Sequence, residues 1–199
     1  STPQLGEFIS GGILVDETLR QKIGDVTMPE FLAQRGMVPG IKVDQGTQSL
    51  PGSPGEKITQ GLDGLRERLA EYRQLGARFT KWRAVIAIGN DLPTTACIDA
   101  NAESLATFAR LSQEPGLVPI VEPEVLMDGN HPQARCEEVT GTTLRNVFVT
   151  LFEHRVTLEG MLLKTGMVLS GKECAQPASV EDVANATLRC LDDVVPPDV

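Results

Sequence analysis

Short apolar runs alternate along the chain with longer stretches in which apolar residues recur every three or four positions. The runs have the length and β-branched content of strands, and several are bounded by Gly or Pro. They cover residues 11–15, 40–44, 79–88, 117–125 and 161–169. We therefore predict a strand in each of these five segments.

Helical periodicity places one apolar stripe on one face of a helix in three of the intervening segments. The first stripe uses Ile58, Leu62, Leu65, Leu69 and Tyr72, the second Cys136, Val139, Thr143, Val147 and Leu151, and the third Val180, Val183, Ala184, Leu188 and Leu191. Gly76 is expected to end the first helix, and Ser179 to cap the third. Residues 94–113 also fit a helix, with a weaker pattern.

A strand followed by a helix, repeated at a spacing of roughly 40 residues, indicates an α/β fold with a parallel sheet. Strands that are apolar on both sides are typical of a doubly wound sheet or of a closed barrel. The pattern alone leaves these two architectures open.

The composition of the chain argues against several classes of function. The chain has 199 residues with 18 Lys and Arg against 27 Asp and Glu, a net charge of −9, which argues against a nucleic-acid surface. We expect one domain, no membrane span and no secretory signal. The four cysteines share no CxxC spacing, which favours reduced thiols in a cytoplasmic compartment. Only two His are present, so a His-rich metal site is not expected.

Charged residues interrupt the predicted strands at positions that share a face, because side chains two apart on a strand point the same way. These residues are Lys42 and Asp44, Lys81 and Arg83, Glu122 and Glu124, and the single Lys164. A bare charge in a buried strand costs several kcal/mol unless it is paired. In a barrel they would converge at the carboxyl ends of the strands, where active sites form.

Each pair also has an ordinary explanation. Lys42 and Asp44 fit a strand-end ion pair, Lys81 and Arg83 an exposed edge strand, and the two glutamates a solvated strand exit. Lys164, flanked by apolar residues, fits such an explanation least well.

The functional alternative is imine chemistry. A Lys in an apolar pocket beside other cations has a lowered pKa and can attack a carbonyl carbon. Lys81 and Arg83 would supply the positive field for Lys164, and Glu122 and Glu124 would transfer protons. The cations would also attract a phosphorylated substrate. The residues by themselves indicate an imine-forming lyase or transferase.

Several motifs resemble the class I fructose-bisphosphate aldolases, in family order along essentially the whole chain. They are GGIL with ETL (11–19), GIKVDQG (40–46), ITQGLDGL (58–65), KWR (81–83), VPIVEPEVLMDG (118–129), LEGMLLK (158–164) and VPPDV (195–199). The resemblance implies a (β/α)8 TIM barrel and metal-independent, reversible cleavage of fructose 1,6-bisphosphate to two triose phosphates. It implies no cofactor, phosphorylated ketose and triose substrates, and a homo-oligomer, by family habit a tetramer.

The resemblance also implies roles for particular residues. Lys164 corresponds to the Schiff-base lysine and Glu122 to the general acid and base, while Glu124 tunes Glu122. Lys81 corresponds to a catalytic and substrate-binding residue. Arg83 and Lys42 correspond to substrate-binding residues.

The chain also departs from the family pattern. Thr165 and Gly166 stand where the family has Pro and Asn, Gln45 replaces a common Lys, and Asp16 a common His. The predicted strands match strands two to six of the barrel. We therefore expect residues 1–199 to form one barrel domain that is incomplete at both ends and whose outer strands are unpaired edges.

Three hypotheses remain open at this stage. The first is an aldolase of which this chain is the central portion. The second is a non-catalytic, aldolase-like scaffold that binds a sugar phosphate or a protein partner. The third, another imine-forming barrel enzyme such as a transaldolase, is disfavoured by the combination of KWR, VEPE and LLK.

Overall fold

The centre of the molecule is a sheet of parallel strands. The computed structural model describes residues 4–199, and within that range five strands pair in the order β1-β4-β7-β8-β9. Their bounds are β1 Gly11–Leu14, β4 Val38–Lys42, β7 Phe79–Ile86, β8 Val118–Val125 and β9 Leu162–Leu163. All four neighbouring pairs are parallel, which confirms the predicted sheet, with β1 and β9 at its edges.

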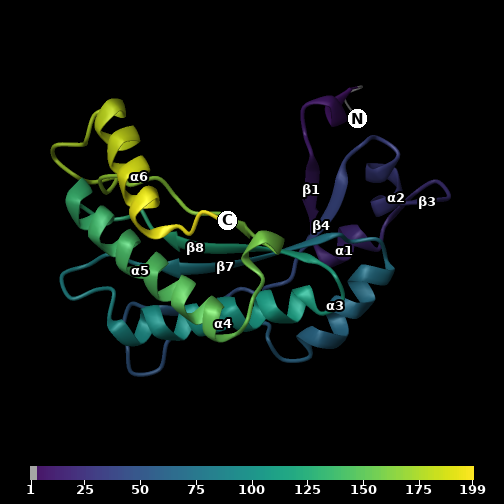
Figure 1. The fold of residues 1–199 in the computed structure, drawn as a ribbon, viewed down its shortest axis with the longest axis horizontal. Coiled ribbons are helices and arrows are strands. Elements are labelled where there is room, and N and C mark those ends of the chain that lie inside the picture. The colour runs from purple at the N-terminus through teal and green to yellow at the C-terminus, as the bar shows by residue number, and fades with distance from the viewer. Residues whose placement is uncertain (1–3) are drawn as a thin grey trace.

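The long helices lie along one side of this sheet (Figure 1). They are α3 Leu65–Gln74, α4 Thr95–Gln113 and α5 Gln133–Glu153, and α6 Val180–Val194 packs against α5. The core fills the layer between sheet and helices. There Trp82 of β7 stacks on Phe108 of α4 with ring centroids 5.6 Å apart. The other side of the sheet carries no helix layer in the described residues, so the ribbon has the form of a trough.

Short helices and two hairpins lie in the segments that connect the strands of the sheet with the long helices. Helix α1 Asp16–Leu19 follows β1, and the hairpin of β2 Lys22–Ile23 and β3 Val26–Thr27 leads into α2 Met28–Ala33. A second hairpin, β5 Thr47–Ser49 with β6 Lys57–Thr59, follows β4. Single 3-10 turns occupy Leu5–Glu7 and Leu158–Gly160. None of these elements was expected from the apolar pattern.

The first predicted helix begins later than its apolar stripe. Ile58 lies in β6, and α3 starts only at Leu65. Gly61 and Gly64 have φ of 121° and 61°, a left-handed conformation that interrupts a helix and suits glycine. The predicted end is confirmed, because α3 stops at Gln74 and Gly76 has φ of 110°.

The strand predicted for residues 161–169 is reduced to Leu162–Leu163. Its pairing with β8 covers only Leu162 and Leu163, although β8 itself continues to Val125. Beyond it the chain turns to the loop that follows β8. There the amides of Gly171 and Lys172 donate to the carbonyls of His131 and Met127 at 2.8 Å each.

Helix α6 begins as predicted but turns a different face to the protein. The Ser179 hydroxyl accepts from the Asp182 amide in a capping box. Val180 and Leu188 of the predicted stripe are 88% and 61% exposed, whereas Ala186 and Cys190 are buried. The contact with α5 sets this face, since Cys190 packs beside Cys136 of that helix.

Candidate functional site

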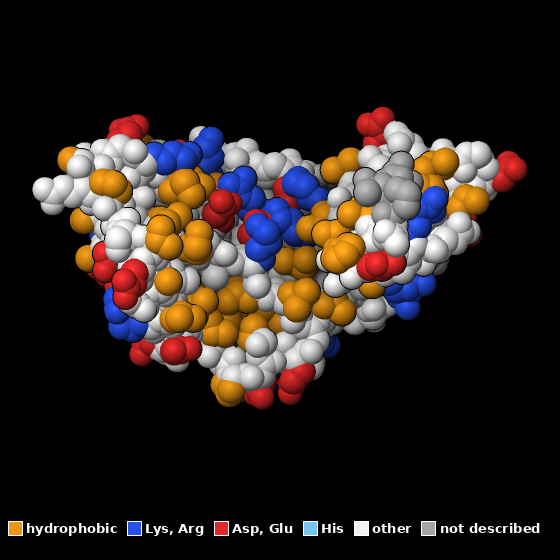
Figure 2. Space-filling model, turned by 90° about the horizontal axis from the view of Figure 1, so that it is seen from above, with side chains coloured by type: hydrophobic (Ala, Val, Ile, Leu, Met, Phe, Trp, Pro, Cys, Tyr) orange, Lys and Arg blue, Asp and Glu red, His pale blue; other side chains and the backbone are white. Residues whose placement is uncertain are grey.

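The uncovered side of the sheet carries the predicted charged residues. Side chains alternate along each strand, so even-numbered residues of β7 face the helices and odd-numbered ones face the trough. The register places Lys42 of β4 opposite Lys81 of β7, and Arg83 opposite Glu122 of β8. Figure 2 shows Lys and Arg side chains gathered with acidic ones near the middle of this surface.

Glu122 is the centre of the cluster. Its side chain is 4% exposed, and its two carboxylate oxygens contact two different ammonium groups, Lys81 on one side and Lys164 on the other. Lys81 is 12% exposed, so it is nearly as buried as its partner. A buried carboxylate shared by two lysines satisfies the requirement that interior charges be paired.

Lys164 lies at the edge of the trough, just beyond β9. Its amide donates to the Val121 carbonyl at 2.9 Å, which fixes the backbone beside Glu122. Its side chain is 57% exposed. The sequence predicts an apolar pocket around this amine, and the structure sets Lys164 between the Glu122 carboxylate and a cavity whose lining includes Leu162 and Val195. The volume of this cavity is about 840 Å³, and Leu163, Thr165 and Leu191 also line it.

Two further ion pairs surround this centre. Arg83 contacts Glu124, whose carboxylate raises the pKa of the guanidinium. Lys42 contacts Asp44 with Nζ and Oδ1 2.6 Å apart, and its ammonium also donates to the Asp44 carbonyl. Asp44 is 5% exposed in its side chain. The strand-end pair considered for Lys42 and Asp44 therefore does form, and it lies beside Lys81 in the register.

The structure thus brings together every residue that the sequence singled out. Lys81, Glu122 and Lys164 are in direct contact, and Arg83, Glu124 and Lys42 occupy neighbouring positions on the same face. The sequence places Asp44 on the same face as Lys42, but the resemblance assigns it no role. The alternation of charge at positions 42 and 44 is the signal that could have selected it.

Toward the amino ends of the strands, the side chains that face the trough are apolar. A hollow of about 440 Å³ is lined mainly by Ile13, Val38, Phe79, Ile120 and Leu162 at the amino-terminal half of the strands. The trough is therefore divided, with apolar side chains at the amino ends and charged ones at the carboxyl ends. Charged residues at the carboxyl ends of parallel strands are the arrangement on which (β/α)-barrel active sites are built.

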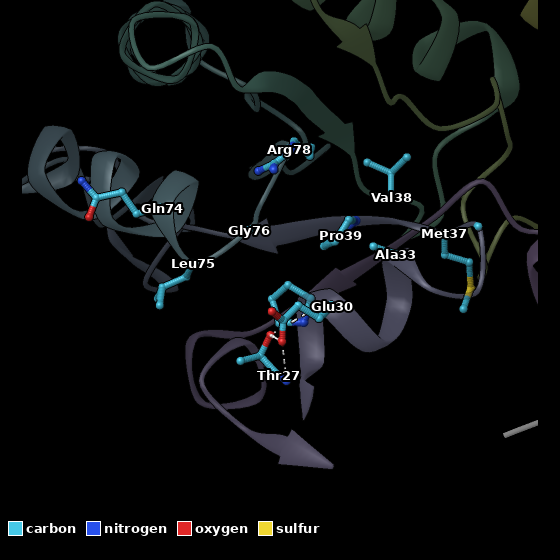
Figure 3. A pocket seen from close by; sticks show the side chains of 12 residues that line it. Thr27, Glu30, Ala33, Met37, Val38, Pro39, Gln74, Leu75, Gly76 and Arg78 are labelled. Carbon is cyan, nitrogen blue, oxygen red and sulfur yellow. Dashed lines mark hydrogen bonds between the residues drawn. The ribbon is translucent and has the colours of Figure 1, made fainter. Parts of the chain in front are cut away.

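Another cavity, of about 720 Å³, lies at the opposite end of the strands, between α2, the start of β4 and the end of α3 (Figure 3). Its acidic group is already engaged, because Glu30 accepts from the Thr27 amide at 3.0 Å and from the Thr27 hydroxyl at 2.8 Å. These bonds hold the pKa of Glu30 below its usual range. Its lining includes none of the ion-paired residues of the trough, and its carboxylate, Glu30, serves to cap α2. This cavity is therefore separate from the charged cluster.

Metal-binding and membrane-spanning features complete the description of the surface and the helices. Within residues 4–199, no three His, Cys, Asp or Glu side chains lie grouped so that they could hold a metal ion. No helix in the same range combines the length and the apolar character needed to cross a bilayer.

The fold and the cluster define a (β/α)-barrel protein, here with five βα units and a lysine-carboxylate centre at the carboxyl ends of its strands. The family model for "Fructose-bisphosphate aldolase class-I" matches residues 1–199. The chain therefore belongs to the class I fructose-bisphosphate aldolase family.

Individual relatives agree with this assignment. The chain is 58% identical over 197 residues to a probable fructose-bisphosphate aldolase class 1 of Xanthomonas campestris, covering 98% of this chain and 59% of that protein. It is 50% identical over 200 residues to fructose-bisphosphate aldolase 1 of Toxoplasma gondii, covering 99% of this chain and 55% of that one. The chain thus spans between half and three-fifths of the length of these curated relatives.

A solved structure also matches the chain over nearly its whole length. It is fructose-bisphosphate aldolase from Plasmodium falciparum, determined in complex with TRAP and a small-molecule inhibitor. The TM-score is 0.95 at 48% sequence identity, covering 98% of this chain and 57% of that one. This likeness supports the barrel architecture that the parallel sheet and its helices indicate.

Proposed function

We propose that the protein is a fructose-bisphosphate aldolase that cleaves fructose 1,6-bisphosphate reversibly to dihydroxyacetone phosphate and glyceraldehyde 3-phosphate through an imine on Lys164. The observation that carries the proposal is the contact of one buried carboxylate, Glu122, with both Lys164 and Lys81. Such a carboxylate can take a proton from the Lys164 ammonium and so free the amine for attack on the ketose carbonyl.

Glu122 also suits the later proton transfers. Attack of the amine on the carbonyl carbon gives a carbinolamine, which loses its hydroxyl as water when an acid supplies a proton. The protonated Glu122 can supply it and return to the carboxylate. Cleavage of the C3–C4 bond then requires a base that takes the proton of the C4 hydroxyl, whose oxygen becomes the carbonyl of the aldehyde product while the electrons of the broken bond pass to the iminium and form an enamine. The same carboxylate, regenerated in the preceding step, can take that proton. Lys81 holds that carboxylate in place and donates toward the substrate.

The charge balance of the site favours an anionic substrate. Four cations, Lys42, Lys81, Arg83 and Lys164, face three carboxylates, Asp44, Glu122 and Glu124, so the cluster carries one net positive charge although the chain carries −9. Cationic side chains on a shaped surface attract phosphate esters. We propose Lys42 and Arg83 as substrate-binding residues.

The experiment is trapping with borohydride in the presence of dihydroxyacetone phosphate. We expect a reduced, covalent adduct on Lys164 and none in Lys164→Arg, with EDTA leaving the reaction unchanged. Lys172→Arg is the matched control, because Lys172 is similarly exposed and paired with a carboxylate, Asp128. Labelling at another lysine would refute the imine proposal, and binding of the sugar phosphate without trapping would favour a non-catalytic scaffold.

We further propose a role in glycolysis and gluconeogenesis, a cytoplasmic location and a homo-oligomeric, tetrameric assembly. The metabolic role and the tetrameric assembly are proposed because the chain belongs to the class I aldolase family. The location is supported by the four cysteines, which are free thiols, three of them buried. Sedimentation of the purified protein tests the assembly, and a species of monomer mass at micromolar concentration would contradict it.

A further inference from the structure

Arg68 of α3 binds backbone rather than an acidic side chain. Its Nη1 donates to the Val43 carbonyl at 3.0 Å, and its Nη2 donates to the Gly61 carbonyl. Val43 is 1% exposed and lies between Lys42 and Asp44 in the chain. The guanidinium therefore holds the peptide that joins these two charged residues of the trough.

That peptide lies just beyond the last residue of β4 that pairs with β7. The β4–β7 pairing ends at Lys42, and the Val43 amide makes one last bond to the Lys81 carbonyl at 3.1 Å. From there the chain leaves the sheet for the hairpin of β5 and β6. Just after β6 the chain returns, where the Gln45 amide donates to the Gln60 carbonyl and the Gln60 amide donates to the Gly46 carbonyl, at 2.8 Å each. From α3, Arg68 connects the segment that leaves β4, through Val43, with the segment that returns from β6, through Gly61.

The neighbouring residue Arg66 shows that this arrangement is not a general property of arginines on α3. Arg66 is 63% exposed and pairs with Glu114 on the surface. Arg68, in contrast, lines a cavity of about 490 Å³ together with Lys42 and Asp44. The two arginines lie two positions apart on the same helix, and only one of them faces the charged end of β4.

We propose that Arg68 is a positioning residue, which directs Lys42 and Asp44 toward the substrate by holding the Val43 carbonyl; this inference rests on the proposed aldolase function. The carboxylate and the amine of the reactive centre lie on β8 and after β9, and the hydrogen bonds of Arg68 go to the carbonyls of Val43 and Gly61 and not to Glu122 or Lys164. The role is therefore confined to substrate binding at the β4 side of the trough.

The test compares Arg68→Met, Arg68→Lys and the matched control Arg66→Met in steady-state cleavage of fructose 1,6-bisphosphate. Losing two charge-assisted hydrogen bonds should raise KM about tenfold in Arg68→Met, with kcat within about twofold of the wild type. Arg68→Lys keeps one donor and should give an intermediate KM. Arg66→Met should match the wild type in both constants.

Amide hydrogen exchange supplies a readout that does not depend on activity. In Arg68→Met, residues 43–46 and 60–62 should exchange about tenfold faster, while β8 keeps its protection. A KM and an exchange rate equal to those of the wild type would overturn the proposal. So would equal losses of kcat and folded fraction at constant KM, which indicate a purely structural role. If Arg68→Met does not fold, the KM and exchange of Arg68→Lys decide.

The proposed function and this inference fail in different ways. A wild-type protein that forms no trapped imine refutes the aldolase proposal. The exchange difference between Arg68→Met and Arg66→Met is then still measurable and tests whether Arg68 fixes the end of β4. A wild-type protein that forms the imine, combined with an unaltered Arg68→Met, refutes the positioning role alone.

Discussion

Replacing Glu122 by Gln is the most informative perturbation of the trough, because it removes one charge and almost no volume. The carboxylate is 4% exposed and contacts Lys81, which is 12% exposed, and Lys164, which is 57% exposed. Without it, Lys81 keeps its charge in a nearly buried position with Lys42 opposite it in the register. The variant thus separates the effect of charge from the effect of packing.

The expected loss of stability follows from the two contacts. Breaking a buried ion pair by removing one partner costs about 3–5 kcal/mol, and Lys81 fits that case. An exposed pair is worth about 1 kcal/mol or less, and Lys164 is closer to that case. The amide of Gln retains weak hydrogen bonding, which offsets part of the loss. We expect a decrease of about 3 kcal/mol in the free energy of unfolding.

The assay is urea denaturation at pH 7, followed by circular dichroism, with Glu124→Gln as the matched control. Glu124 is 33% exposed and its partner Arg83 is 42% exposed, so the control should lose about 1 kcal/mol or less. Cleavage activity should fall by about 100-fold or more in Glu122→Gln, as expected for a lost proton-transfer group. Equal, small losses of stability in both variants would refute the assignment of Glu122 as the buried counter-ion.

Three further predictions concern packing, capping and pH. Gly40→Ala should lower the free energy of unfolding by about 1–3 kcal/mol, because its new Cβ would lie 2.2 Å from ring atoms of Phe79; an unchanged melting temperature would contradict this. Ser179→Ala removes the cap of α6 and should cost about 1 kcal/mol in urea denaturation, with an unaltered midpoint as the contrary result. Burial lowers the pKa of His131 below 6.5, so the unfolded chain binds its proton more readily and stability is lost as pH falls below that value. Urea midpoints between pH 7 and pH 5 should vary less in His131→Gln than in His154→Gln, and equal slopes would refute the assignment.

The charged positions could be predicted from sequence because side-chain alternation along a strand is a local property. KWR places Lys81 and Arg83 on one face and Trp82 on the other, whatever the strand pairs with. The same holds for Glu122 and Glu124 on β8.

Features that depend on distant partners were not predictable in this way. The buried face of α6 is set by α5, which covers Cys190 and leaves Leu188 exposed. The surroundings of Lys164 depend on a carboxylate 42 positions earlier in the chain. Arg68 has no local signal at all, since its partners are backbone carbonyls brought to it by the excursion between β4 and α3.

The sequence presents Glu122 and Glu124 as equivalent, two carboxylates on one face of the same strand. Their neighbours make them different. Glu122 contacts both Lys81 and Lys164, whereas Glu124 contacts the guanidinium of Arg83. A guanidinium does not give up its proton in proteins, so the pair of Glu124 with Arg83 has no proton to move. An ammonium can give up a proton, and the proposed imine reaction requires that Lys164 lose one before its amine attacks the carbonyl carbon. We therefore infer that proton transfer belongs to Glu122 and that Glu124 holds Arg83 in place. Arg83→Lys gives Glu124 an ammonium partner in place of the guanidinium and leaves the neighbours of Glu122 unchanged. It should therefore leave the imine reaction on Lys164 intact and weaken substrate binding. A lost imine with retained substrate binding in Arg83→Lys would refute this division of roles between the two carboxylates.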